Sequence, residues 1–158
     1  MSMRRGKREV VDVPEPRRQD QSLARLIQVR KQRLGRLERE RNEARQQWRE
    51  GRAALRVCKE QRRQSLNAAH AFWNSARERF LQMSTTSGDL RKAKATYERM
   101  KDDAARCYLA WQEQLARCDA AGRAFFGALS AVLAANRQQE KLHIVNDEMR
   151  QLAARNED

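Results

Sequence analysis

Side chains that commonly carry chemistry are few in this sequence, and they are not grouped. The two histidines, His70 and His143, are far apart, and the three cysteines, Cys58, Cys107 and Cys118, form no CxxC pair. A zinc site needs cysteine and histidine at short, repeated spacings, and a nucleophilic cysteine needs a base beside it. Glycine-rich phosphate loops, an HExxH motif and a serine nucleophile elbow are also absent from the sequence. These residue types therefore predict no metal site, no cofactor and no covalent catalysis.

The acidic residues give no catalytic pair either. Asp102, Asp103 and Glu148 have no partner at a spacing suited to general acid–base chemistry. Charged side chains of this kind are usually solvated on a helix surface. The sequence therefore predicts a protein that is not an enzyme and that takes no small-molecule substrate.

Positive charge dominates the chain and is unevenly distributed. The net charge is +13, and residues 22–83 carry 16 basic and six acidic side chains. A field of this sign favours an acidic partner, which can be a nucleic acid, an anionic membrane or an acidic cavity in another protein.

Cysteine usage and hydropathy predict a cytoplasmic protein. The odd number of cysteines and the lack of a signal-peptide pattern favour a reducing compartment. The longest weakly polar run extends from Ala124 to Ala135, which is shorter than the roughly 20 residues that span a bilayer. We therefore expect no transmembrane segment.

Two long helical segments are expected to position the side chains. Residues 1–21 contain Pro14 and Pro16 and are predicted to be a disordered, basic tail. A first helix is predicted over residues 22–83 with Ser22 as its N-cap, and a second over residues 90–154. The polar turn at residues 84–89 offers Thr86 or Ser87 as a cap for the second helix, with Asp89 near its positive end.

Apolar residues at heptad spacing predict that these helices pack together. A short turn forces them to be antiparallel, and residues should pair where their numbers sum to about 172. The fold class is therefore all-α, a long antiparallel two-helix coiled-coil hairpin over residues 22–155 that is roughly 90–100 Å long. The seam of the first helix contains arginines, and a second apolar stripe lies near the turn at Leu66, Trp73 and Phe80. The predicted seam positions are Leu23, Ile27, Arg30, Leu34, Leu37, Arg41, Ala44, Trp48, Gly51, Leu55, Cys58, Arg62, Ser65, Ala69, Phe72, Ala76, Arg79 and Met83 on the first helix, and Leu90, Tyr97, Met100, Ala104, Cys107, Trp111, Cys118, Ala121, Phe125, Ala128, Val132, Ala135, Leu142 and Met149 on the second, which has a further flanking row at Tyr108, Leu115 and Leu129.

The segment from Gly122 to Ala135 is rich in glycine and alanine. Such residues allow two backbones to approach closely. The segment can pack against Leu34, Leu37 and Trp48 of the first helix, or it can serve as a docking face for another subunit.

Two short motifs carry a resemblance to a known family. Residues 26–38 match the pattern LxxVRxxRxxRxE near the start of the first helix, and residues 136–142 match NRxxEKL near the end of the second. The chain resembles the central stalk proteins of bacterial type III secretion systems (the YscO/SctO family) and their flagellar FliJ-like counterparts. The resemblance covers residues 22 to about 152, and the basic tail of this chain departs from the family pattern.

The resemblance implies a stalk that links an export ATPase to a membrane export gate. In that family the end with both termini enters the pore of the hexameric type III secretion ATPase, and translocator chaperones are further partners. On this basis two positions, Trp73 and Phe80, are candidates for binding the export gate, with packing across the hairpin as the alternative. The candidates for binding the ATPase are Arg25, Arg30, Lys31, Arg33, Arg36, Arg137, Lys141 and Arg150.

Two other functions fit parts of the sequence. A basic coiled coil that binds nucleic acid fits the charge of the first helix, although its basic residues interleave with the seam instead of forming a separate basic region. A generic coiled-coil scaffold is the other alternative, and dimerisation of the isolated protein would cover a seam interrupted by arginines.

Overall fold

Two helices account for nearly all of the chain. The computed structural model describes residues 18–156, and over that range the chain is an all-α helical hairpin without strands. Helix α1 is Arg18–Leu81 and helix α2 is Ser87–Arg155. The chain divides into two compact units, each built from both helices. Unit 1 contains the described residues up to Gly35 and from Ala135 onward, and unit 2 is Arg36–Ala134.

The helix boundaries differ from those expected from the sequence. Helix α1 begins at Arg18, so Ser22 lies within its first turns and the N-cap assignment for Ser22 was wrong. A good capping residue permits a helix start, but no residue from Arg18 onward removes a backbone donor, and the helix therefore begins earlier. Of the predicted tail, residues 1–17 lie outside the described residues, and residues 18–21 belong to α1. At its other end α1 stops at Leu81, and α2 begins at Ser87.

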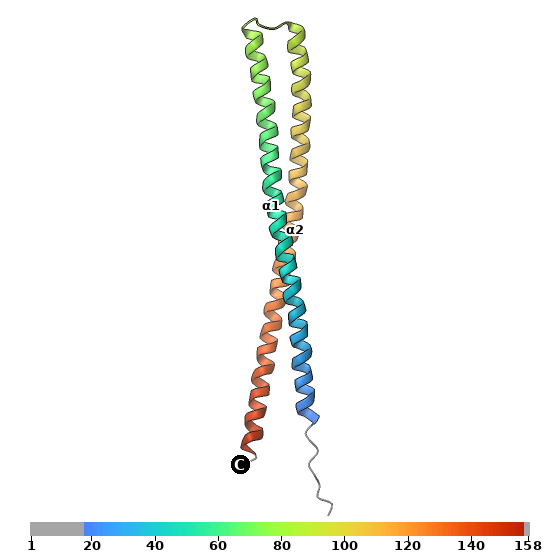
Figure 1. Ribbon diagram of the computed structural model, residues 1–158, viewed down its shortest axis with the longest axis vertical. Coiled ribbons are helices and arrows are strands. Elements are labelled where there is room, and N and C mark those ends of the chain that lie inside the picture. The colour runs from blue at the N-terminus through green and yellow to red at the C-terminus, as the bar shows by residue number, and fades with distance from the viewer. Residues whose placement is uncertain (1–17, 157–158) are drawn as a thin grey trace, which may run out of the picture. The chain divides into compact units, whose positions relative to one another are not determined.

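Figure 1 shows the short connection between the helices, and two capping motifs close it. Met83 has a positive φ of 59°, its amide donates to Phe80 O, and the amide of Ser84 donates to Arg79 O. This is the Schellman arrangement, in which the left-handed residue is usually glycine. On the other side Thr86 Oγ1 accepts a hydrogen bond from the amide of Asp89, while Asp89 Oδ2 accepts one from the amide of Thr86. This capping box confirms Thr86 as the N-cap of α2.

Unit 2 holds the helices together along the predicted heptad seam. Buried and half-buried positions on α1 recur at steps of three and four residues, from Leu37 and Arg41 to Phe72 and Ala76. The buried apolar side chains are small: Ala69, Ala76, Ala104, Cys118 and Val132. Met83 and Arg79 were wrongly placed in the seam, because α1 ends before Met83 and both side chains are exposed.

Aromatic contacts set the register and direction within unit 2. Trp48 stacks on Phe125 with ring centroids 5.4 Å apart, and Trp73 stacks on Tyr97 at 5.2 Å. Between them Arg62 lies 5.2 Å from the centroid of Trp111. Residue numbers fall along α1 as they rise along α2, so the helices of unit 2 are antiparallel. The predicted pairing is confirmed to within about two residues.

Glycines show where the helices approach most closely. A Cβ on Gly122 would lie 3.1 Å from Trp48 Nε1, whereas one on Gly127 would meet nothing within 4 Å. The expectation of tight packing against Trp48 is therefore confirmed at Gly122. It does not hold at Gly127, which is exposed.

The seam of unit 1 includes polar side chains. Arg30, a predicted seam position, donates from Nη1 to Gln138 Oε1 at 2.7 Å. Gln139 is 8% exposed, and its amide donates to His143 Nε2 at 3.2 Å while its Oε1 has no partner. Met149 was expected in the seam but is 37% exposed. Arg30 and Gln139 thus lie in the seam of unit 1 together with half-buried apolar residues such as Leu34 and Leu142.

Candidate interaction surfaces

The cations predicted to bind an ATPase are distributed over both helices. Seven of the eight lie in unit 1, and Arg36 lies in unit 2. Within the described residues six of them are exposed and form no ion pair. These six are Arg25, Lys31, Arg33, Arg137, Lys141 and Arg150.

The other two predicted cations have partners inside the protein. Arg30 is half-buried and binds Gln138, so it also belongs to the seam. Arg36 Nε lies 3.5 Å from Glu40 Oε1 on the same helix. An exposed pair of this kind contributes at most about 1 kcal/mol, so Arg36 can exchange Glu40 for another carboxylate.

The two side chains predicted to bind an export gate differ in exposure. Trp73 is half-buried, and its ring stacks on Tyr97 at an interplanar angle of 16°. Phe80 is 38% exposed. Packing across the hairpin therefore accounts for Trp73, and Phe80 has more surface available to a partner.

Residues with chemical potential stay apart in the described part of the chain. No group of three or more His, Cys, Asp or Glu side chains that could hold a metal gathers there. Cys58 and Cys107 are half-buried and Cys118 is buried, all with free thiols. The structure thus places the cysteines in the seam, as the heptad rows predict.

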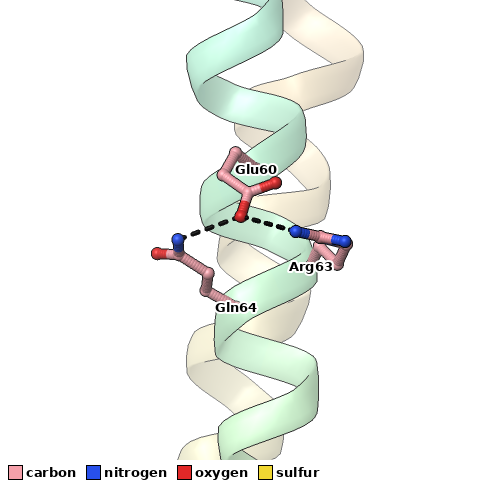
Figure 2. A network of polar contacts seen from close by, with 3 residues as sticks. All are labelled: Glu60, Arg63 and Gln64. Atoms are coloured by element: carbon pink, nitrogen blue, oxygen red, sulfur yellow. Dashed lines mark hydrogen bonds and ion pairs between the residues drawn. The ribbon is translucent and has the colours of Figure 1, made fainter.

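The shifted pKa values belong to solvated groups that interact with residues three or four positions away. Hydrogen bonds from Arg63 and Gln64 lower the pKa of Glu60, and Figure 2 shows both donors converging on its carboxylate. Glu60 in turn raises the pKa of Arg63. The hydrogen bonds from Thr86 lower the pKa of Asp89 in the cap. The hydrogen bonds stabilise the charged forms of these side chains, which already dominate at neutral pH. The shifts therefore create no acid or base near neutral pH.

A basic stripe on α1 is absent from the sequence-based predictions. Its six cations follow one another at steps of four and three residues, so they lie on one face of the helix. The spacing of these cations in the sequence could have revealed the stripe, whereas the total charge of the helix does not. The basic stripe consists of Arg45, Arg49, Arg52, Arg56, Lys59 and Arg63, all exposed and all in unit 2.

Few internal partners compensate the basic stripe. Arg63 pairs with Glu60 at 2.9 Å, and the guanidinium of Arg52 lies 5.2 Å from the centroid of Trp48. Within the described residues the other four members form no ion pair. Like charges at these spacings destabilise a helix by about 0.2–0.5 kcal/mol per neighbouring pair. The stripe therefore weakens α1 unless an anion neutralises it.

Exposed apolar side chains lie beside the basic stripe. Leu66 is 41% exposed, Tyr108 38% and Phe126 54%, and Leu115 is half-buried between the last two along α2. We call these four residues the apolar row. Leu66 and Tyr108 line an open groove of about 270 Å³, together with Arg62, Lys101, Ala104 and Ala105.

Helix α2 also has an apolar stretch that the predicted run understated. One 18-residue stretch of α2 is long and apolar enough to cross a membrane, judged by length and composition alone.

Comparison with known proteins gives no match for this chain. No protein-family model, no curated protein and no solved structure is similar to it.

Proposed function

We propose that this chain is a non-enzymatic coiled-coil stalk of a bacterial type III secretion apparatus. The observation that carries the proposal is unit 1, where both helices present exposed cations that form no ion pair within the described residues. The resemblance of residues 26–38 and 136–142 to stalk proteins supports it. In this function unit 1 enters the hexameric export ATPase, stimulates it and connects it to the export gate. The protein works in the cytoplasm at the inner-membrane base of the apparatus, where it serves protein transport and virulence.

Weak, repeated contacts suit a shaft inside a ring. Each exposed ion pair contributes only about 0–1 kcal/mol, so no single contact fixes the shaft against one ATPase subunit. Cations on both helices, such as Arg33 and Lys141, let each subunit meet a comparable surface. The shaft then biases the subunits in turn and promotes assembly of the ring.

Further partners fit the other unit. Phe80, next to the connection between the helices, is the better candidate for the export gate, because Trp73 is occupied by its stack on Tyr97. Translocator chaperones complete the proposed set of partners.

Charge reversal in unit 1 tests the proposal. The triple variant Arg33→Glu, Arg137→Glu, Lys141→Glu replaces three exposed cations that form no ion pair in the described structure. We expect it to lose stimulation of the cognate ATPase while circular dichroism shows unchanged helicity. A matched variant, Arg39→Glu, Arg99→Glu, Arg123→Glu, makes the same change in net charge within unit 2 and should retain stimulation. Equal stimulation by both variants would contradict a role for unit 1.

A further inference from the structure

We infer that unit 2 carries a docking surface for an acidic amphipathic helix of another protein. The surface combines the basic stripe of α1 with the apolar row beside it. Apart from Arg36, the cations proposed to contact the ATPase lie in unit 1, and the surface includes none of the eight, so the inference stands independently of the stalk function.

Ring contacts place the basic stripe and the apolar row on the same face of unit 2. Arg52 lies over the ring of Trp48, and Trp48 in turn meets the edge of Phe126 at 5.4 Å. Near the other end of the stripe, the half-buried seam residue Arg62, which precedes Arg63, lies 4.6 Å from the centroid of Tyr108. Leu66 shares one groove with Tyr108 and a second groove with Lys59 and Arg63. A helix lying along this face would therefore touch cations on one side and apolar side chains on the other.

The length of the basic stripe suggests the length of its occupant. From Arg45 to Arg63 the helix rises by about 27 Å at 1.5 Å per residue. Cations at steps of three and four residues match carboxylates at the same steps on a neighbouring helix. The occupant is thus a helical segment of about 18–20 residues with glutamate or aspartate along one edge.

The charge of this face calls for an anionic partner. Arg45, Arg49, Arg56 and Lys59 have no ion pair within the described residues. Two nearby carboxylates already form ion pairs: Glu60 binds Arg63, and Glu98 lies 3.6 Å from Lys101. Asp119, one heptad before Phe126, is a third acidic residue on this face and leaves the cations in clear excess.

Other occupants fit the surface less well. A second copy of this chain would bring the same six cations against themselves. A nucleic acid would satisfy the basic stripe through its phosphates, but it would leave the exposed apolar surface of Leu66 and Phe126 uncovered. An anionic bilayer presents a flat surface, whereas Leu115 is half-buried between the helices and is reached best by an inserted side chain.

Binding of a synthetic peptide to the full chain tests the inference. The probe is a peptide of about 20 residues with leucine at two positions of every heptad and glutamate at the flanking positions. The control peptide carries lysine in place of glutamate. Binding is measured by fluorescence anisotropy at about 0.15 M salt, where non-specific attraction is largely screened.

Matched variants locate the binding. We expect Arg49→Glu, Arg52→Glu, Arg56→Glu to weaken peptide binding by at least about tenfold, and Arg39→Glu, Arg99→Glu, Arg123→Glu to change it less than about threefold. Leu66→Ser should weaken binding by about fivefold. Val57→Ser is its control, because Val57 is also exposed on α1 but lies outside the apolar row. Circular dichroism confirms that each variant remains helical.

Three results would overturn the inference. One is equal binding of the glutamate and lysine peptides. Another is an equal loss with both triple variants, which would reduce the interaction to net charge. The third is stripe-dependent binding of a short duplex DNA, or of phosphatidylserine vesicles, by a chain that does not bind the glutamate peptide.

Discussion

At the scale of single residues, Met83 has a backbone conformation that residues other than glycine rarely adopt. A φ of 59° is in the left-handed region, where a side chain meets the following carbonyl and glycine does not. The hydrogen bonds from Met83 and Ser84 to the last turn of α1 hold this conformation in place. The side chain of Met83 is 88% exposed and contributes little packing in return.

Replacing Met83 with glycine should stabilise the hairpin. We expect Met83→Gly to raise the free energy of unfolding by about 0.5–1 kcal/mol, because the steric cost of the left-handed conformation disappears. Urea denaturation followed by circular dichroism measures the change. Gln82→Gly is the control, since residue 82 has no positive φ and glycine there should give no gain. A less stable Met83→Gly variant would contradict the described turn.

Two glycines of α2 should respond oppositely to alanine. Gly127→Ala adds a methyl group in open space and should stabilise the helix by about 0.8–1 kcal/mol. Gly122→Ala must displace the ring of Trp48, which packs against both Phe125 and Phe126, and should therefore lower stability. Thermal denaturation of the two variants gives the order directly. If Gly122→Ala were the more stable variant, Trp48 would not pack against this glycine.

At the scale of helices, the seam could be predicted because helix geometry ties it to sequence spacing. Apolar residues every 3.5 positions fixed which face of α1 is buried, and the short turn fixed the pairing of Trp48 with Phe125. The start of α1 could not be predicted in this way. Serine is a good N-cap, but it can also lie inside a helix, as Ser22 does. The hydrogen bond from Arg30 to Gln138 depends on the register of both helices, which no single motif contains.

The basic stripe was missed for a different reason. The charge of α1 was evident from its composition, but its arrangement on one face follows only when the spacing is placed on the helix. Which residues would contact the proposed ATPase depends on the shape of that partner, and neither charge nor helix geometry contains that information.

Added salt should stabilise the protein. The stripe contains five neighbouring like-charged pairs, which together destabilise α1 by roughly 1–2.5 kcal/mol at low ionic strength. Raising sodium chloride screens this repulsion, so the free energy of unfolding in urea should increase. Arg49→Gln, Arg52→Gln, Arg56→Gln should be more stable than the parent at low salt and less sensitive to salt.

Paired arginines provide the control for the salt experiment. Arg117 lies 2.7 Å from Glu113, so Arg117→Gln removes an attraction and should lower stability slightly at low salt. A parent protein that loses stability as salt is added would show that attractive pairs outweigh the stripe.

At the scale of the whole molecule, the two units have separate proposed partners: the ATPase for unit 1 and an acidic helix for unit 2. Charge reversal at Arg33, Arg137 and Lys141 should abolish ATPase stimulation and leave peptide binding intact. Charge reversal at Arg49, Arg52 and Arg56 should do the opposite. A protein that only carried diffuse positive charge would lose both activities together.

The most direct test of the stalk function is ATPase turnover of the cognate secretion ATPase, measured with increasing amounts of this protein at about 0.15 M salt. The account predicts stimulation that saturates near one hairpin per six ATPase subunits, because a single shaft fills a hexameric ring. Absence of stimulation by a folded, helical preparation would contradict the stalk function.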